Sequence, residues 1–540
     1  MGETKNDRRE VDVAVIGAGS AGMSAYRAAV KQGARTVLIE SGEYGTTCAR
    51  HACMPSKLLI AAANALHDTT LLDGFGIVLD APPRVDEARV LERVRRERDR
   101  FAGLVVEEVE GFPAADKLRG LARFLSDTVL QVGDDIEVHA RAIVIATGAA
   151  AVIPDEYRVL GPTLVTSDDV FEWRTLPRRL AVVGTGVIAI ELGQALSRLG
   201  VDVTMFGKRD NLASISDPKV ADYALRTFSR EFPIHQHAEV QAALGDDGRA
   251  ELRFTDAEGA ARRESFDLVL VATGRTPNLG KLSLENTSVR RDAHGVPLFD
   301  PDTLQCLSER NGREGDDASG HAGTSAPVPG APVPGAPVPG APVPGAPVPG
   351  APVPGAPVPG APVPGAPIFI AGDANHQRPW LNDASNEGRI AGEGAVHWPA
   401  AAPQTRPVVL SLVFSDPAVL LAGQPLSALD PNTIAIGEVS FENQGRSRVM
   451  QRNHGLLRVY ADLRSGHLLG AEGIAPAGEH LAHLIAWCVQ QRMTLDQILT
   501  MPFYHPVFEE GLRTALRDAA KARVRAHPCA DPSLSDAVGA

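Results

Sequence analysis

Two cysteines separated by four residues are the groups in this chain best suited to redox chemistry. Cys48 and Cys53 lie in the segment Gly45-Thr-Thr-Cys-Ala-Arg-His-Ala-Cys-Met-Pro-Ser-Lys57. A straight helix would hold their Cα atoms beyond the ~7 Å that a disulfide can span, so a bridge needs a distorted turn. Pro55 suits the first turn of a helix, and a helix that begins there favours a thiolate at Cys53. The alternative is a pair of structural thiols that stay reduced.

A dinucleotide-binding fingerprint precedes the cysteines. Its parts, in order, are a strand at 11–16, Gly17, Gly19, Gly22, a helix to Lys31, a strand at 36–39 and Glu40. The first glycine permits a tight turn, the second lets the backbone approach a pyrophosphate, and the third lets the helix pack on the strand. Glu40 can accept a hydrogen bond from a ribose hydroxyl. A lone glycine triplet would be weak, but this full context predicts a dinucleotide site.

The same pattern recurs about 167 residues later in the chain. A strand at 180–183 leads into Gly184-x-Gly186, a helix through Leu199 and a strand at 201–206, and Ala189 stands where the third glycine would be. Two fingerprints predict two nucleotide sites, an arrangement in which one cofactor passes hydride to the other.

Three further apolar runs end in glycine-containing turns. Residues 143–146 lead into Thr147-Gly148, residues 268–272 lead into Thr273-Gly274, and residues 368–371 lead into Gly372-Asp373. Open α/β sheets bind ligands at the carboxyl ends of their strands, so Asp373 is a candidate ligand-binding acid. The alternative is an aspartate that caps the next helix.

Acid–base chemistry has one candidate near the end of the chain, in Phe503-Tyr-His505-Pro-Val-Phe-Glu-Glu510. A thiol–disulfide relay needs an acid/base that titrates near neutrality, which histidine supplies. Glu510 could hold one ring nitrogen, although a lone histidine before proline is more often structural. Lys57 is either a surface lysine or a charge that reaches the thiolate of Cys53.

Composition and charge exclude several classes of function. The formal net charge of −13 argues against general affinity for nucleic acid or anionic lipid. The arginine-rich run at 93–100 contains acidic residues and is expected to be a solvated helix face. No apolar run is long enough to span a bilayer, and the charged first residues are unlike a signal peptide. Five cysteines do not suggest a secreted disulfide framework, so a cytoplasmic location is expected.

Residues 326–365 form eight copies of Ala-Pro-Val-Pro-Gly. Two prolines in each unit oppose helix and sheet, so 308–365 is predicted to be a disordered or semi-extended insertion. It is either a neutral expansion or a Pro-x-x-Pro segment that binds a partner. From 406 onward, strand-like runs precede helix-like runs at 479–491 and 509–523, which predicts a separate α+β domain.

Together the motifs resemble the class I pyridine nucleotide–disulfide oxidoreductases, and most closely the dihydrolipoamide dehydrogenase group. The matching segments are Gly17-x-Gly19-x-x-Gly22, Cys48-x4-Cys53-x3-Lys57, the second fingerprint with Glu191, Ala272-Thr-Gly274-Arg-x-Pro-Asn278, Ala371-Gly-Asp373 and His505-Pro-x3-Glu510. The resemblance implies an α/β protein with two Rossmann-like domains, for FAD and NAD(P), and a C-terminal α+β dimerisation domain. The implied parts are 1–155 (FAD domain, first part), 156–278 (NAD(P) domain), 279–400 (FAD and central domain, second part, containing the 308–365 insertion), 406–525 (dimerisation domain) and 526–540 (flexible tail).

The resemblance also implies roles. Cys53 would face the flavin ring, Cys48 would meet the substrate, and Lys57 would lie near flavin N5, paired with Glu191. His505 and Glu510 would come from the partner subunit of a homodimer. The implied FAD contacts are Gly17, Gly19, Gly22, Glu40 (ribose), Thr47, Lys57, Ala122, Thr147, Gly148, Asp373 (ribityl chain) and Ala384. The implied nicotinamide contacts are Gly184, Gly186, Ala189, Glu191, Gly207, Lys208, Arg209 and Gly274. No metal site is predicted.

This chain departs from the family pattern in three places. Arg50 and His51 stand between the cysteines, where small or apolar residues are usual, and Val507 replaces a threonine. Gly207-Lys-Arg209 ends the second strand of the second fingerprint, where NAD-using relatives carry an acid. The cations favour a 2′-phosphate and hence NADPH, whereas dihydrolipoamide dehydrogenases generally use NAD.

The predicted function is FAD-dependent electron transfer between NAD(P)H and a small dithiol or disulfide, with dihydrolipoamide and NAD⁺ as the first choice. The alternatives are a mercuric-reductase-like or other NADPH-dependent disulfide reductase and a catalytically idle scaffold. A mercuric reductase normally has an adjacent cysteine pair near its C-terminus, where this chain has only Cys529. The intact thiol pair and the His505–Glu510 pair argue against a scaffold.

Overall fold

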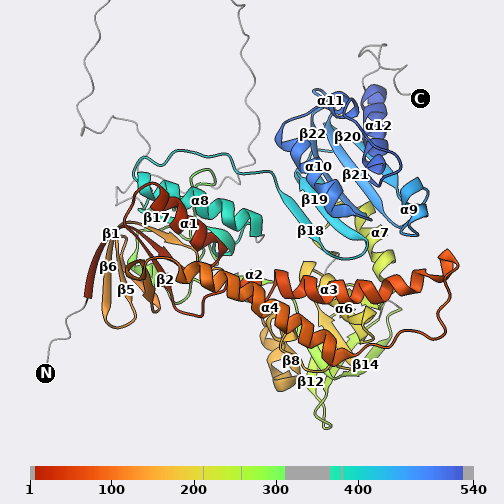
Figure 1. Ribbon diagram of the computed structural model, residues 1–540, viewed down its shortest axis with the longest axis horizontal. Helices are drawn as coiled ribbons and strands as arrows, with labels where there is room; N and C mark the ends of the chain where they lie inside the picture. The colour runs from red at the N-terminus through yellow and green to blue at the C-terminus, as the bar shows by residue number, and fades with distance from the viewer. Residues whose placement is uncertain are drawn as a thin grey trace, which may run out of the picture.

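The computed structural model describes residues 7–208, 210, 212–256, 258–309, 365–378 and 381–526. Figure 1 shows three regions, each built around its own sheet. The long helix α4 (Glu87–Glu110) runs from the first region to the second, and α3 (Cys53–Asp68) packs against α4 and extends between the second region and the third. The first two sheets have parallel cores and the third is antiparallel. The predicted α/β class is confirmed.

The first sheet has the order β3-β2-β1-β6-β5-β4, and β17 also pairs with β6. Its strands are β1 (Asp7–Ile16), β2 (Thr36–Glu40), β3 (Lys117–Arg119), β4 (Ala122–Ser126), β5 (Val129–Val132), β6 (Ile136–Ile145) and β17 (Ile368–Ile370). β17 therefore returns to this sheet from a distant part of the chain, in parallel with β6. The β1 strand begins four residues before the predicted apolar run, because its charged start pairs with β6 as far as Ile136.

Helices α1 (Ser20–Lys31) and α8 (Leu381–His397) pack together beside the first sheet (Figure 1). Two glycines of α8 set their separation. A Cβ atom at Gly388 would lie 2.1 Å from the carbonyl oxygen of Ala21, and one at Gly392 would lie 2.4 Å from that of Ala25. The helices therefore touch backbone to backbone, which fixes the turn before α1 against the segment before α8.

The second sheet is parallel throughout, with the order β11-β10-β9-β15-β8. Its elements are β8 (Leu164–Val165), β9 (Arg179–Val183), α6 (Val187–Arg198), β10 (Asp202–Phe206), α7 (Pro218–Phe228), β11 (Ile234–His235) and β15 (Leu268–Val271). A three-stranded antiparallel sheet flanks it, made of β12 (Gln241–Leu244), β13 (Ala250–Thr255) and β14 (Ala261–Phe266). Buried apolar side chains from both sheets form one core between them.

The third sheet is antiparallel, with the order β18-β19-β22-β21-β20. Its strands are β18 (Leu410–Val413), β19 (Ala418–Gly423), β20 (Ile434–Ser440), β21 (Leu456–Asp462) and β22 (Leu468–Ala475), and α10 (Gly478–Gln490) and α12 (Glu509–Ala526) pack on it. Sequence analysis misses β19 and β22, although both lie inside the sheet. β22 contains two glycines and an acid, which weakens its strand signal.

Short elements complete the described chain. They are α2 (Thr47–Arg50), β7 (Ala149–Ala151), α5 (Ser167–Val170), β16 (Arg275–Pro277), α9 (Gly445–Val449), α11 (Leu495–Leu499) and seven short 3-10 segments. No helix of this described part is both long and apolar enough to cross a membrane.

Two expectations need correction. The arginine-rich run lies on α4, but Arg98 is only 8% exposed and pairs with Glu172, so one member of the run is structural rather than solvated. The insertion was expected to begin at 308, yet Ser308 forms a β-bridge with Val289 and lies within the fold. Residues 310–364, which hold almost all of the repeat, and the tail beyond 526 lie outside the described residues.

Candidate active site

The two cysteines lie at a break between two helices. α2 ends at Arg50 and α3 begins at Cys53, so the chain turns sharply between them. The hydroxyl oxygen of Thr46 caps α2 by accepting a hydrogen bond from the backbone N–H of Ala49 (3.1 Å). This geometry brings the side chain of Cys48 into hydrogen-bond contact with that of Cys53, and both are free, half-buried thiols. The distorted turn predicted from the spacing is what the structure contains.

The contact divides the charge unequally between the two sulfurs. The hydrogen bond from Cys48 lowers the pKa of Cys53 to about 7, with help from the positive charge of Lys57, while burial opposes the shift. The same hydrogen bond and burial raise the pKa of Cys48. The proton therefore stays on Cys48, and Cys53 at the start of α3 carries the thiolate.

Lys57 is held by an ion pair from the second region. Its Nζ atom lies 2.9 Å and 3.0 Å from the two carboxylate oxygens of Glu191 on α6. Glu191 is 4% exposed and also accepts a hydrogen bond from the backbone N–H of Phe414 (2.9 Å), whose ring lies 4.5 Å from Nζ. The predicted Lys57–Glu191 pair thus connects residues from all three regions next to the thiols.

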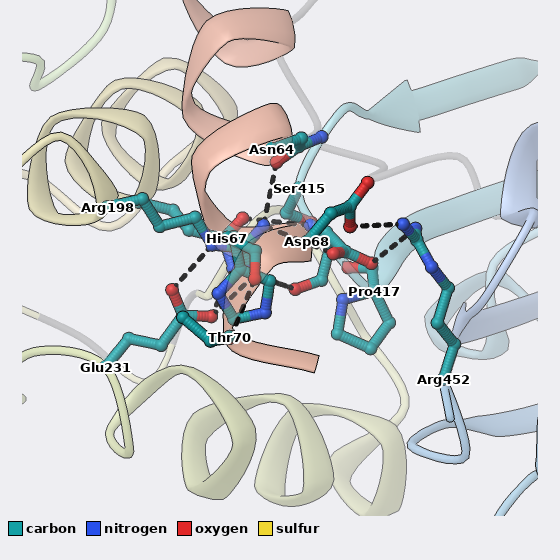
Figure 2. Close-up of polar contacts among 11 residues, drawn as sticks. Asn64, His67, Asp68, Thr70, Arg198, Glu231, Ser415, Pro417 and Arg452 are labelled. Atoms are coloured by element: carbon teal, nitrogen blue, oxygen red, sulfur yellow. Dashed lines mark hydrogen bonds and ion pairs between the residues drawn. The ribbon is translucent and has the colours of Figure 1, made fainter. Parts of the chain in front are cut away.

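The other end of α3 is anchored by a cluster of polar contacts (Figure 2). Arg198 of α6 is 4% exposed, and its guanidinium donates to Asn64 Oδ1 (2.7 Å), Glu231 Oε2 (2.8 Å) and Asp416 Oδ2 (3.2 Å). Asp68, at the end of α3, pairs with Arg452 from the third region (2.5 Å). Because both ends of α3 are tied to the second and third regions, the thiols have a fixed position relative to all three.

The first glycine turn opens into a cavity of about 450 Å³, whose lining includes Gly17, Gly19, Thr47, Thr147 and Gly148. A Cβ atom at Gly17 would lie 2.3 Å from the carbonyl oxygen of Ala146, and one at Gly22 would lie 1.8 Å from that of Gly17. Gly19 faces open space. Gly17 and Gly22 therefore close the turn, and Gly19 leaves its backbone approachable.

Glu40 lies at the end of β2 and lines the same cavity. Its carboxylate accepts hydrogen bonds from the backbone N–H of Ala18 (2.8 Å) and of Gly42 (2.7 Å). The acid of the fingerprint thereby holds the glycine turn against the loop that leads to the cysteines.

The remaining predicted FAD contacts divide into three groups. Asp373 is in a turn after β17, where burial raises its pKa. Ala384 is buried on α8 beside Gly372. Ala122 is 2% exposed, and its side chain packs in the core of the first sheet, away from the cavity lining.

The second glycine turn resembles the first in its backbone and differs in the side chains around it. A Cβ atom at Gly184 would lie 2.3 Å from the carbonyl oxygen of Ala272, Gly186 faces open space, and Ala189 is fully buried. Gly274 follows β15, in a backbone conformation with φ +133° that favours glycine. Glu191 lies on α6 of this turn but points to Lys57.

The predicted determinants of nicotinamide choice follow β10. Gly207 donates its backbone N–H to His235 (2.8 Å), so it continues the sheet edge. Lys208 is exposed and pairs with Glu156 (2.9 Å). Arg209 lies outside the described residues.

His505 and Glu510 form a pair at the start of α12. Nδ1 of His505 lies 3.0 Å from Oε1 of Glu510, and this contact lowers the pKa of the carboxyl. The imidazole is 80% exposed. Figure 1 places α12 in the third region, away from α2, so the structure does not bring His505 to the thiols of its own chain.

Sequence analysis missed three groups that shape this site. Thr46 caps α2, and Phe414 contacts both members of the Lys57–Glu191 pair. Glu387 on α8 accepts hydrogen bonds from the Gly372 N–H (2.8 Å) and the Asn375 amide (2.7 Å), on either side of Asp373. Only Thr46 has a signal in the sequence, because threonine is a common N-cap residue directly before a helix. The other contacts join segments far apart in sequence.

Comparison with known proteins identifies the family. A model of the pyridine nucleotide-disulphide oxidoreductase family matches residues 11–304, and a model of the dimerisation domain of that family matches residues 409–516. The chain therefore belongs to the class I pyridine nucleotide–disulphide oxidoreductases. It is an FAD- and NAD(P)-dependent oxidoreductase, and its dimerisation domain supports a homodimer.

The proteins that this chain resembles include enzymes with different named activities. The chain is 27% identical over 513 residues to a mercuric reductase of Shigella flexneri, covering 93% of this chain and 80% of that protein. It is 26% identical over 521 residues to a dihydrolipoyl dehydrogenase of Haloferax volcanii, covering 94% and 96%. The HOCl-induced flavoprotein disulfide reductase RclA of Escherichia coli shares the fold, with a TM-score of 0.72 and 19% identity over 94% of this chain and 99% of that one.

The first cavity fits FAD. Its floor is a glycine turn that a Cβ atom would fill, and α1 presents its N-terminus there without an acid in its first turn. The hydroxyl of Thr147 lines the cavity and is buried with no hydrogen-bond partner among the described residues. These features suit a diphosphate and the hydroxyls next to it.

Proposed function

We propose that this protein oxidises dihydrolipoamide to lipoamide and reduces NAD⁺, using Cys48 and Cys53 as its disulfide. The observation that supports this most is the division of the proton between the two thiols, with a thiolate at Cys53 beside the Lys57–Glu191 pair. Structural thiols would gain nothing from a partner that lowers one pKa to about 7. The dihydrolipoyl dehydrogenase relative, which the chain matches over nearly its whole length, supports the choice of substrate.

In the oxidised enzyme, one substrate thiolate attacks the sulfur of Cys48. The Cys48–Cys53 bond breaks, a mixed disulfide forms on Cys48, and Cys53 leaves as the thiolate that its surroundings favour. The second substrate thiolate then attacks the substrate sulfur of the mixed disulfide, which closes the lipoamide ring and releases Cys48. The substrate has lost two electrons, the cysteine pair has gained them, and protons are the only atoms transferred.

The protons require a base, which we assign to His505 of the partner subunit. With Nδ1 held by Glu510, Nε2 can take a proton from the substrate thiol and return one to the sulfur of Cys48. The high exposure of His505 fits a group that completes a site on a second copy of the chain.

Bound FAD supplies the two-electron transfer between the thiol pair and the nicotinamide. Lys57 would face the flavin with its charge held in place by Glu191, and the glycine turns would hold the diphosphates of FAD and NAD⁺. NADP⁺ is the alternative to NAD⁺, because the cations Lys208 and Arg209 would favour a 2′-phosphate.

The proposal is tested by anaerobic titration of the protein with dihydrolipoamide, glutathione and Hg(II), each with both nicotinamides. We expect rapid flavin reduction by dihydrolipoamide. Cys53→Ser should abolish turnover yet keep the yellow flavin, whereas Cys488→Ser, a half-buried cysteine on α10, should change neither. Full activity of Cys53→Ser would refute the relay.

The histidine has its own test. His505→Ala should slow the dithiol half-reaction about 100-fold or more while hydride transfer from NADH changes little. His480→Ala, an exposed histidine on α10, is the matched control. An equal loss in both half-reactions of His505→Ala would contradict an acid–base role.

A mercuric-reductase-like activity is the second candidate, supported by the relative of that name. Apart from Cys48 and Cys53, the described cysteines are Cys306, fully buried, and Cys488, so the described residues hold no second adjacent pair. Cys529 lies outside them. NADPH oxidation that depends on Hg(II) and exceeds the rate with lipoamide would favour this candidate.

A further inference from the structure

Arg50 and His51, the residues that depart from the family pattern between the cysteines, both line the cavity of the first glycine turn. Arg50 is firmly placed. Its Nε donates to the carbonyl oxygen of Tyr44 (2.8 Å), and its guanidinium lies 3.3 Å from Glu43. A Cβ atom at Gly45 would lie 2.4 Å from this Nε, so the glycine leaves the room that the arginine occupies. The guanidinium is therefore packed at the cavity by its neighbours rather than spread over the surface.

Arg50 is the one arginine or lysine among the described residues that line the cavity. Among its lining residues Glu40 and Glu43 are acidic, and Arg50 alone is permanently cationic. Glu40 already binds two backbone N–H groups, and Glu43 is 83% exposed. A second feature points to a ligand: Nδ1 of His51 is buried and finds no hydrogen-bond partner among the described residues. The N-terminus of the 12-residue helix α1 faces the same space.

We propose that Arg50 binds the diphosphate of FAD and so determines both the affinity for this cofactor and the position of the thiol turn. A guanidinium presents paired N–H donors that match phosphate oxygens. Because Arg50 and Cys48 lie on the same short helix, α2, a phosphate bound to Arg50 holds the first cysteine in place through one turn of backbone. The proposal depends on FAD occupying this cavity and is independent of the disulfide substrate.

The affinity of the apoprotein for FAD, followed by quenching of flavin fluorescence, tests this role. Arg50→Gln should weaken FAD binding about 10-fold to 100-fold, and Arg50→Lys should weaken it less. Arg35→Gln is the matched control, because Arg35 pairs with Asp12 in the same region and does not line the cavity. It should leave the dissociation constant unchanged. The affinity should also fall less steeply with NaCl in Arg50→Gln than in the wild type.

Two further measurements separate a charge contact from loop packing. Glu43→Gln removes the surface partner of Arg50 but keeps the arginine, so FAD affinity should stay the same or increase. ADP should compete with FAD less well in Arg50→Gln than in the wild type, whereas adenosine, which has no diphosphate, should compete equally in both.

The proposal is overturned if Arg50→Gln binds FAD as tightly as the wild type, or if Arg50→Gln and Glu43→Gln weaken it alike. Equal losses for ADP and adenosine would also overturn it. Should Arg50→Gln fail to fold, the comparison of Arg50→Lys with Glu43→Gln gives the same decision.

Discussion

The two glycine turns have nearly the same backbone and different surroundings. At both, a Cβ atom on the first glycine would lie 2.3 Å from a carbonyl oxygen, and the second glycine faces open space. The third position separates them. A Cβ at Gly22 would lie 1.8 Å from Gly17 O, whereas Ala189 carries a Cβ and is fully buried without displacing its turn. The first helix therefore packs more closely on its turn than the second does.

The side chains around the two turns also differ. The segment around α2, with Thr46, Thr47, Arg50 and His51, lines the cavity of the first turn, and Glu40 accepts hydrogen bonds from the backbone on both sides. In the second motif the segment after β10 carries Lys208, which is exposed and pairs with Glu156 on the surface.

The helices after the two turns, α1 and α6, also differ in the partner that one matching side chain contacts. Seven residues after the first glycine, α1 has Ser24, which donates to the carbonyl of Ser385 on α8 (2.6 Å) and so stays within its own region. The matching position of α6 is Glu191, which crosses to Lys57. One copy of the motif has a packing residue where the other has a group that reaches the thiol site.

The largest expected effect tests the third position. Gly22→Ala should yield protein without bound FAD, because the new Cβ collides with the turn and overpacking alone costs about 1–3 kcal/mol or more. Ala189→Gly should keep FAD and lose about 1–2 kcal/mol of stability, from helix propensity and one lost methyl. The ratio of flavin to protein absorbance and a thermal melt measure both. Retention of FAD by Gly22→Ala would mean that the two turns are equivalent.

A medium effect tests the reach of Glu191 into the first site. The pKa of Cys53 is about 7, so alkylation of its thiolate should rise through half-maximum near pH 7. Lys57 lowers this pKa and Glu191 raises it. Lys57→Met should therefore move the profile to higher pH by about one unit, and Glu191→Gln should move it to lower pH by less. Shifts of the same sign in both variants would show that the glutamate acts only by holding the lysine.

The smallest expected effect concerns the segment after β10. Lys208→Ala should lower kcat/KM for NADPH relative to NADH by no more than about fivefold, because the lysine is exposed and shares its charge with Glu156. FAD content should not change. A strong preference of the wild type for NADH would remove the case for a 2′-phosphate contact at this position.

Much of the site is visible in the sequence because its signals are local. The glycine turns, the acid at the end of β2 and the break between the cysteines each depend on residues within about 30 positions of one another. By contrast, β22 was missed because its glycines and its acid conceal a strand that only neighbouring strands stabilise.

The sequence by itself determined the two nucleotide turns, the thiol spacing and the class of chemistry, since backbone conformation follows from nearby residues. Only the tertiary structure decided that Cys48 gives its hydrogen bond to Cys53, that Phe414 joins the Lys57–Glu191 pair, and that Arg50 lines the cofactor cavity. Charge interactions of this kind depend on distance and burial, and those are set by how remote segments pack against each other.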